Sequence, residues 1–340
     1  MKILIVASNM VHIKNFHIPY IEALREKGHE VSVMTASCEA DFDVPFQKRA
    51  FSLKNLALSF KIKKILKRER FDALLLHTTL AAFWTRFAIK GLKSKPIVIN
   101  TVHGYLFSKN SSVLKRKIYL FAERLVRKST DYIFVMNKED YNIATENKLC
   151  KKEVVFMDGM GVNFEHIAQN EKNFEPKENI RLVYVGEISK RKNQIFLVQA
   201  LTRLENAHLT LVGDGDEREH IERVAREKGV SNRLTITGFT KDVKKHLENT
   251  DIYVSASTIE GLPFNIIEAM AMKLPIVASD IKGQSDLLPI EQLYPLNDMD
   301  AFVRLIEDTS LTPHFYDIEK YKLENAFERN IRLYLNALEK

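Results

Sequence analysis

The amino-acid sequence predicts an α/β protein of two Rossmann-like domains. The length of 340 residues suits two domains of the usual ~150 residues each. Short β-branched runs alternate with helical stretches along the chain, which is typical of parallel sheets. The polar segment 169–179 contains a proline and is the expected linker. We therefore expect one domain at 1–168, a second at 180–317 and a long helix within 318–340.

The composition is that of a globular protein in a reducing compartment. Hydrophobic residues make up 45% of the chain, and no stretch approaches the ~20 apolar residues of a membrane span. The two cysteines, Cys38 and Cys150, have no paired spacing and predict neither a metal site nor a disulfide framework. The apolar run at the N-terminus is too short for a signal peptide and suits a first strand.

The first half opens with a strand–helix–strand pattern. We expect strands at 2–7 and 30–35, with a loop at 8–16 and a helix at 18–27 between them. The loop and the residue that follows it carry the polar side chains Asn9, His12, Asn15 and His17. Either His12 and His17 contact a ligand, or they have a structural role.

The rest of the first half continues the alternation of helices and strands. The expected elements are a basic helix at 60–70, a strand at 73–76, an apolar helix at 80–89, a strand at 96–101, a helix at 113–128, and strands at 132–137 and 154–157. His103 and Gly104 stand at the end of the strand 96–101. Because ligands of open α/β sheets bind beyond the carboxyl ends of strands, His103 is a candidate binding residue. The alternative is a polar cap of the strand.

Positive charge is concentrated in the first half. Residues 1–170 contain 28 Lys and Arg against 16 Asp and Glu, a net charge of +12, and the remainder carries −5. The helix 113–128 is the most basic, with Lys115, Arg116 and Lys117 beside an apolar stripe. Either the stripe packs inward, or the helix rests on anionic lipid, where each Lys or Arg contributes about 1 kcal/mol. The charge could also serve only to steer anionic ligands and to maintain solubility.

In the second half, glycines and a basic triplet follow the expected strands. Strands are expected at 181–185, 209–212 and 234–237, and helices at 194–204 and 318–338. The turn after the first of these strands carries Arg191 and Lys192, and a cation there can neutralise a departing diphosphate. Alternatively, the basic triplet Lys190, Arg191 and Lys192 is only exposed to solvent. The turns that follow the three strands begin with Gly186, Gly213 and Gly238.

The stretch 251–279 is a strand–turn–helix–strand unit with two carboxylates, and its strands are expected at 251–255 and 275–279. Glu260 lies in the turn, and Glu268 lies about a turn and a half into the helix expected at 265–272. Pro263 suits the first turn of that helix. A helix N-terminus favours phosphate, and Glu268 behind it could accept hydrogen bonds from ribose hydroxyls. Alternatively, Glu260 caps the helix and Glu268 faces solvent.

This Glu pair, with its flanking turn, helix and strands, resembles the signature of the retaining glycosyltransferases of family 4, which have the GT-B fold. The resemblance implies that Glu268 binds the nucleotide ribose and that Glu260 lies beside the donor sugar. It also implies that Lys192 binds the donor phosphate and that the imidazole of His103 approaches the donor sugar. It assigns to the donor site Gly186, Arg191, Lys192, Gly213, Gly238, Phe239, Glu260, Gly261, Leu262, Phe264, Asn265 and Glu268. It assigns to the acceptor side Asn9, His12, Asn15, His17 and Gly104.

Two positions depart from the family pattern. The first loop lacks the glycine pair that most members carry, and Glu187 stands where many members have Arg. Either Arg191 supplies the second positive charge, or Lys192 acts with the helix N-terminus alone.

The function that the resemblance implies is retaining transfer of a sugar from a UDP-sugar to an acceptor hydroxyl. The chain also resembles bacterial enzymes that build capsule, exopolysaccharide or O-antigen chains, which implies a lipid-linked acceptor. The first domain would bind the acceptor, the second the nucleotide-sugar, and the C-terminal helix would cross back to the first domain. We expect no metal and no other cofactor, because no Asp-x-Asp cluster stands at a strand end. The enzyme would be cytoplasmic and peripheral on the anionic inner face of the cell membrane.

Three other functions are compatible with parts of the sequence. A UDP-sugar 2-epimerase has the same architecture but needs no acceptor. A non-catalytic partner subunit is suggested by Glu187. A nucleic-acid-binding protein should interleave exposed aromatic residues with basic ones, whereas the aromatic residues here mostly fall on apolar stripes.

Overall fold

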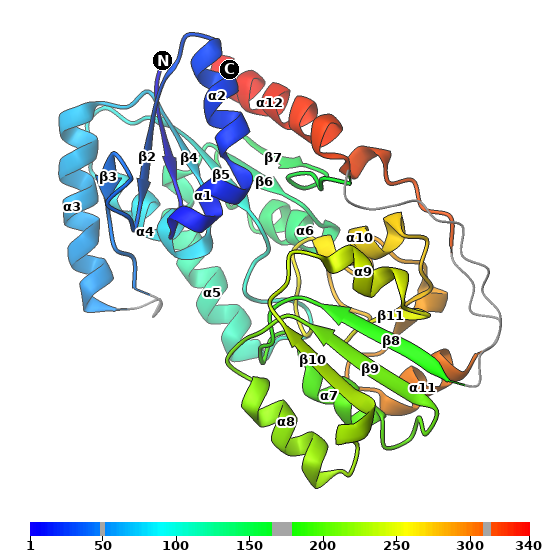
Figure 1. Ribbon diagram of the computed structural model, residues 1–340. Coiled ribbons are helices and arrows are strands. Elements are labelled where there is room, and N and C mark those ends of the chain that lie inside the picture. The colour runs from blue at the N-terminus through cyan, green and yellow to red at the C-terminus, as the bar shows by residue number, and fades with distance from the viewer. Residues whose placement is uncertain (48–51, 165–178, 309–313) are drawn as a thin grey trace. The chain divides into compact units, whose positions relative to one another are not determined.

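The computed structural model describes residues 1–47, 52–164, 179–308 and 314–340, which form two compact units (Figure 1). Unit 1 is Met1–Gly161 together with Glu324–Lys340, and unit 2 is Val162–Leu323. Each unit is a parallel sheet with helices, which confirms the predicted α/β fold of two Rossmann-like domains. The expected linker 169–179 lies outside the described residues except for Asn179.

The sheet of unit 1 has seven strands in the order β3-β2-β1-β4-β5-β6-β7, and every neighbouring pair is parallel. From β1 the chain adds β2 and β3 on one side of the sheet and then β4 to β7 on the other, so the topological switch point lies between β1 and β4. The strands are β1 (Lys2–Val6), β2 (Glu30–Thr35), β3 (Phe42–Asp43), β4 (Ala73–Leu76), β5 (Ile97–Val102), β6 (Tyr132–Val135) and β7 (Glu153–Phe156). The central strands are buried on both faces, which explains their continuous apolar sequences.

The helices of unit 1 cover both faces of this sheet. They are α1 (Met10–Phe16), α2 (Ile18–Glu26), α3 (Leu53–Glu69), α4 (Thr79–Ile89), α5 (Val113–Val126), α6 (Lys138–Glu146) and α12 (Leu323–Glu339). On one face, Leu4 and Leu74 of the sheet pack with Ile62 of α3 and Ile89 of α4. The sequence interpretation did not include α6.

Helix α1 occupies most of the segment 8–16, which we expected to be a loop. Asn9 caps this helix, because its Oδ1 accepts a hydrogen bond from the backbone N of His12 at 2.9 Å. The prediction was wrong because only Ile13 of α1 is buried, so the apolar periodicity that signals a helix is missing.

Helix α12 packs on unit 1, as the GT-B resemblance implied. Tyr334 Oη lies 2.8 Å from Thr101 Oγ1, and Asn330 Nδ2 donates to Tyr20 Oη at 3.0 Å and to Gly159 O at 2.8 Å. The helix begins later than the expected residue 318. The preceding segment instead pairs with Val162 in unit 2 and forms a 3-10 turn at Glu319–Tyr321.

The sheet of unit 2 has six parallel strands in the order β10-β9-β8-β11-β12-β13. The strands are β8 (Ile180–Val185), β9 (Ala207–Val212), β10 (Leu234–Gly238), β11 (Ile252–Ser255), β12 (Ile276–Ser279) and β13 (Leu293–Tyr294). The helices are α7 (Gln194–Ala200), α8 (Arg218–Glu227), α9 (Val243–Glu248), α10 (Phe264–Ala271) and α11 (Met299–Glu307). The expected strand–turn–helix–strand unit is β11, α10 and β12, and its inner stripe of Ile266, Ile267 and Met270 is buried.

Candidate functional site

The candidate site of unit 2 lies at the carboxyl ends of β8 and β11. From β8 the strand order continues to β9 on one side and to β11 on the other, so these two ends flank the topological switch point of the sheet. The loop after β8 carries Arg191 and Lys192, and the loop after β11 carries Glu260. The fold thereby joins residues 68 positions apart in the chain.

Glu260 binds both basic residues. Its Oε1 accepts a hydrogen bond from Lys192 Nζ at 2.6 Å, and its Oε2 accepts one from Arg191 Nη1 at 2.9 Å. Glu260 and Lys192 are buried, whereas the Arg191 side chain is 42% exposed. We call these three residues the Glu260 cluster. With two cations and one carboxylate, the cluster carries one net positive charge.

Burial alone would raise the pKa of the Glu260 carboxyl. The positive charges of Lys192 and Arg191, helped by hydrogen bonds from Lys192 and Ser257, outweigh burial and hold this pKa below its usual value. Glu260 is therefore ionised at neutral pH, and Lys192 is a paired cation in the free protein. An anion that binds here competes with Glu260 for the two basic side chains.

A buried polar network supports the loop that carries Glu260. Ser279 Oγ donates to Ser257 O at 2.6 Å, and Gln284 Nε2 donates to Ser255 Oγ at 2.6 Å. A satisfied buried network of this kind fixes the backbone around it. Our sequence analysis assigned no role to these residues. The signal that could have identified them is the repeated serine at the ends of two expected strands.

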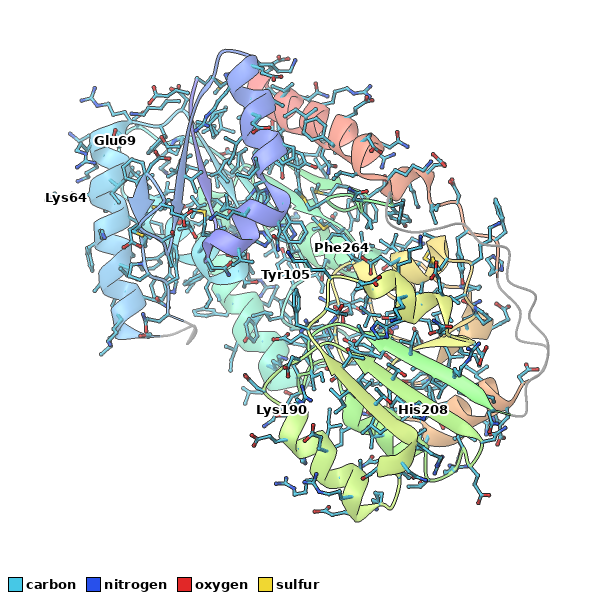
Figure 2. The ribbon with its side chains drawn as sticks, viewed as in Figure 1. Lys64, Glu69, Tyr105, Lys190, His208 and Phe264 are labelled. Carbon is cyan, nitrogen blue, oxygen red and sulfur yellow. The ribbon has the colours of Figure 1, made fainter. Side chains whose placement is uncertain are left out.

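Helix α10 starts immediately after the Glu260 loop. Pro263 is its N-cap and makes no side-chain hydrogen bond to the helix. Asn265 Nδ2 donates to Val185 O at 2.7 Å and so ties the first turn of α10 to the end of β8. Leu262 and Phe264 are partly buried against the apolar cluster beneath the helix, and Figure 2 shows Phe264 at the start of α10. The positive end of the α10 dipole therefore lies at the carboxyl edge of the sheet.

Glu268 lies on α10 and is partly buried. Among the described residues, its carboxylate has no hydrogen-bond or ion-pair partner. Burial raises the pKa of this carboxyl to about 7. Glu268 is thus an acceptor whose hydrogen-bonding capacity is available to a ligand.

Close backbone contacts shape the neighbouring strand ends. A Cβ atom on Gly213 would lie 2.0 Å from Gly186 O, and these two glycines have φ angles of +147° and +140°. Only glycine lets the ends of β8 and β9 approach this closely.

At the end of β10, Gly238 precedes Phe239, whose side chain is 82% exposed. Gly261 lies in the loop that carries Glu260. A Cβ atom on Gly283 would lie 2.5 Å from the carbonyl oxygen of Gly261, so the two backbones are in close contact.

In unit 1, four histidines gather at the carboxyl ends of strands, and we call them the histidine cluster. His12 and His17 belong to the segment after β1, His77 follows β4, and His103 follows β5. One nitrogen of each imidazole lies within 4.8 Å of one nitrogen of each of the others. His77 was missed in the sequence analysis, although its position directly after an expected strand was a usable signal.

Burial keeps these imidazoles neutral. It lowers the pKa of His12 to about 4 and that of His103 to about 3, and it holds those of His17 and His77 well below the usual value. The Nε2 atoms of His12 and His17 are buried without a hydrogen-bond partner among the described residues. Leaving such an atom unsatisfied costs about 1–3 kcal/mol.

The other residues expected on the acceptor side have different surroundings. Asn9 caps α1, and Asn15 lies exposed on the same helix. Gly104 follows His103 with a φ of +121°, a conformation that favours glycine.

Two family models together match most of the chain. The model described as Glycosyltransferase Family 4 matches residues 20–154, and the model described as Glycosyl transferases group 1 matches residues 166–332. The chain belongs to the family 4 glycosyltransferases. The resemblance inferred from the sequence is thereby confirmed.

Relatives of this family 4 glycosyltransferase extend over most of its length. It is 27% identical to the putative glycosyltransferase EpsD of Bacillus subtilis, over 90% of this chain and 86% of that protein. It is 26% identical to the UDP-Gal:alpha-D-GlcNAc-diphosphoundecaprenol alpha-1,3-galactosyltransferase of Escherichia coli, over 83% of this chain and 77% of that protein. It is also 26% identical to the capsular polysaccharide biosynthesis glycosyltransferase CapH of Staphylococcus aureus, over 69% of this chain and 67% of that protein.

Solved structures confirm the GT-B fold. The apo form of the lipopolysaccharide outer core galactosyltransferase WaaB has a TM-score of 0.71 at 18% identity, covering 98% of this chain and 99% of that one. Anabaena Alr3699/HepE in complex with UDP-glucose has a TM-score of 0.73 at 16% identity, covering 99% of this chain and 100% of that one.

The structure also shows where Glu187 lies in this transferase. Its side chain is exposed, and its carbonyl oxygen accepts a hydrogen bond from Gln194 Nε2 at 2.7 Å. Glu187 thus stands apart from the Glu260 cluster, in which Arg191 provides the second cation.

Proposed function

We propose that this glycosyltransferase is a retaining enzyme that transfers a hexosyl or N-acetylhexosaminyl group from a UDP-sugar to a hydroxyl of a lipid-linked glycan during surface-polysaccharide synthesis. The Glu260 cluster at the switch point, beside the start of α10, carries the proposal. Structures of similar fold contain UDP or UDP-glucose. One relative is named for a UDP-Gal donor and a diphosphoundecaprenol-linked acceptor, and another for capsular polysaccharide biosynthesis.

The nucleotide is assigned to unit 2 and the acceptor to unit 1. Glu268 accepts hydrogen bonds from the ribose hydroxyls, and Lys192, Arg191 and the N-terminus of α10 bind the diphosphate. The family pattern places the base near Gly238 and Phe239. The proposed domains remain 1–168 for the acceptor and 180–317 for the donor.

The chemistry that follows is dissociative. The bond between the sugar C1 and the diphosphate oxygen breaks, and an oxocarbenium-like sugar forms. The acceptor oxygen bonds to C1 on the face that the diphosphate leaves, and its proton passes to the departing phosphate, which leaves as UDP. Lys192 and Arg191 exchange part of their interaction with Glu260 for the growing charge on the diphosphate. The family pattern assigns the neutral imidazole of His103 to the donor sugar.

We propose that this step needs no metal, because the Glu260 cluster and the N-terminus of α10 supply positive charge to the departing diphosphate. Two cations and a helix dipole provide the stabilisation that a divalent cation provides in other transferases. We therefore propose a metal-independent reaction with the nucleotide-sugar as co-substrate.

A panel of nucleotide-sugars tests the donor assignment. The thermal unfolding midpoint of the full chain should rise with UDP and with one or more UDP-sugars, because a ligand that binds only the folded state stabilises it. The variant Lys190→Ala should show the same rise as the parent, since Lys190 lies in the loop of Arg191 and Lys192 but has a side chain that is 87% exposed. A response to ADP- or GDP-sugars alone would overturn the UDP assignment.

A surface of unit 1 supports contact with anionic lipid. The apolar stripe of α5 is exposed, and so are its neighbouring basic residues. The exposed apolar residues of α5 are Val113, Leu114, Ile118, Phe121 and Leu125. None of the described helices is both long and apolar enough to cross a membrane. We propose peripheral binding to the inner face of the membrane through α5 and the exposed basic residues of α3, whose Lys64 points away from the sheet (Figure 2).

Several exposed aromatic residues do not follow the expected pattern, and two of them lie on the basic helices α3 and α5. Phe60 on α3 and Phe121 on α5 are 68% and 63% exposed and lie beside basic residues, not on buried stripes. This arrangement suits the interface of a bilayer, where aromatic side chains insert between charged ones.

A further inference from the structure

The histidine cluster is built on a rigid part of unit 1. His77 directly follows β4, and its backbone N donates to Val6 O at 2.8 Å. His17 is the C-cap of α1, and its backbone N donates to Ile13 O at 2.8 Å. The rings of His17 and His77 have centroids 3.8 Å apart, and those of His12 and His103 are 4.9 Å apart. Strand ends and helix ends therefore hold all four rings near one point.

The cluster has unused hydrogen-bonding capacity at its centre. The Nε2 atoms of His12 and His17 are buried and have no partner among the described residues. His77 Nδ1 lies 3.2 Å from His103 Nε2, a contact between two imidazoles. A neutral imidazole has one N–H donor and one acceptor nitrogen, so a nitrogen of the cluster that acts as an acceptor can bind a Lewis acid at its centre.

The rings that pack against the cluster are Phe16, Tyr20 and Tyr334. None of these three side chains carries a carboxylate that could pair with the imidazoles. Each imidazole can offer one unprotonated ring nitrogen to a metal ion.

We propose that His12, His17, His77 and His103 form a binding site for a divalent transition-metal cation of the Zn²⁺ type. Four nitrogen ligands favour Zn²⁺, Co²⁺, Ni²⁺ or Cu²⁺ over Mg²⁺ and Ca²⁺, which prefer oxygen. Zn–N bonds of about 2.0–2.1 Å in a tetrahedron place the nitrogens roughly 3.4 Å apart. The present separations of up to 4.8 Å would therefore have to shorten through movement of the imidazoles when a cation binds.

The proposal is independent of the transfer chemistry at unit 2. It bears on the proposed function at three ligands, because a cation would compete for His103 with the donor sugar and for His12 and His17 with the acceptor. Metal binding itself, and not activity, is therefore the readout.

The experiment uses the full chain, purified without a polyhistidine tag and stripped with a chelator. Titration with Zn²⁺ should leave one equivalent bound after desalting and should raise the thermal unfolding midpoint. Co²⁺ should give the intense visible absorption of a tetrahedral nitrogen site. His17→Gln and His77→Gln should each weaken Zn²⁺ binding by at least about tenfold. His29→Gln is the control, since His29 lies in unit 1 beside the N-terminal amine and outside the cluster.

Absence of retained Zn²⁺ in the parent protein would overturn the proposal. Equal binding in His17→Gln, His77→Gln and His29→Gln would also overturn it, because the ion would then lie on other ligands. If a variant fails to fold, the Co²⁺ spectrum of the parent still decides, since an octahedral spectrum would contradict four-nitrogen ligation.

Discussion

Lys192 and Arg191 are both paired in the free protein with a single buried carboxylate. Because Glu260 is ionised and contacts both, the two cations are held in position before any diphosphate arrives. Positive charge that is placed in advance costs no reorganisation when the leaving group develops its negative charge.

Replacing Lys192 by Ala should lower kcat by roughly 10²–10³-fold, the usual loss when one preorganised charge-stabilising group is removed. Arg191→Ala should cost less, because its side chain is 42% exposed and its charge is more strongly screened by water. Steady-state kinetics with Lys190→Ala as the control would measure both losses. A Lys192→Ala enzyme with an unchanged kcat and only a higher KM would show ground-state binding instead.

Glu268→Gln should weaken UDP binding by roughly 10–100-fold above pH 7, because the ribose hydroxyls lose a charged acceptor worth about 1.5–3 kcal/mol. Burial raises the pKa of this carboxyl to about 7 in the free protein. UDP affinity of the parent should therefore fall as the pH drops from 8 to 6, while the variant shows only the titration of UDP itself. Calorimetry across this pH range checks both effects. If the UDP affinities of the parent and of Glu268→Gln changed in parallel with pH, Glu268 would not be the group that binds the ribose.

At the scale of elements, α5 shows how tertiary contacts override an apolar stripe. Its buried face contains Ala122, Glu123 and Val126, not the stripe of large apolar residues. Glu123 forms a bidentate pair with the buried Arg86 of α4, at 2.8 and 3.0 Å. Glu123 therefore points inward beside Ala122 and Val126, while the large apolar residues and the basic residues of α5 are exposed.

Breaking this pair should destabilise unit 1. Glu123→Ala leaves the Arg86 guanidinium buried without its carboxylate, a change that typically costs about 3–5 kcal/mol. The double variant Arg86→Met/Glu123→Leu should recover most of that loss, because it removes the uncompensated charge. Urea unfolding of the three proteins measures the difference. A single variant as stable as the parent would mean that the pair does not hold α5 in place.

Reversing Lys115, Arg116 and Lys117 of α5 to Glu should weaken binding to vesicles that contain anionic lipid. Three reversed charges remove about 1 kcal/mol of attraction each and add repulsion. Sedimentation should also show that added salt weakens the binding of the parent. Reversal of Arg223, Arg226 and Lys228, which are exposed on α8 in unit 2 or just after it, is the matched control. If binding did not depend on the anionic lipid content of the vesicles, the positive surface of unit 1 would not be a membrane-binding site.

The fold was predictable where local sequence determines structure. Parallel strands such as β4 and β11 are buried on both faces, so their apolar runs stand out, and their predicted positions agree with the structure within a residue or two. Glu260, Glu268 and Lys192 were proposed from spacing, turn residues and the family resemblance, and the structure brings Lys192 and Glu260 into contact. His77, the serine–glutamine network and the Arg86–Glu123 pair were missed, because their environments depend on contacts between segments far apart in the chain.

At the scale of the whole molecule, each unit has its own sheet and its own apolar core. The C-terminal helix belongs to unit 1 through Tyr334 and Asn330, so the chain that builds unit 2 is inserted between two parts of unit 1. The proposed chemistry divides in the same way, with a donor in unit 2 and an acceptor in unit 1. The central claim is therefore that UDP release requires an acceptor.

That claim is tested most directly by measuring UDP release from the UDP-sugar selected by the panel, with and without a glycan linked to polyprenyl diphosphate. The account predicts release that depends on the acceptor, and a glycosidic product that keeps the anomeric configuration of the donor. UDP release or epimerisation of the sugar nucleotide without any acceptor, or a product of inverted configuration, would contradict it.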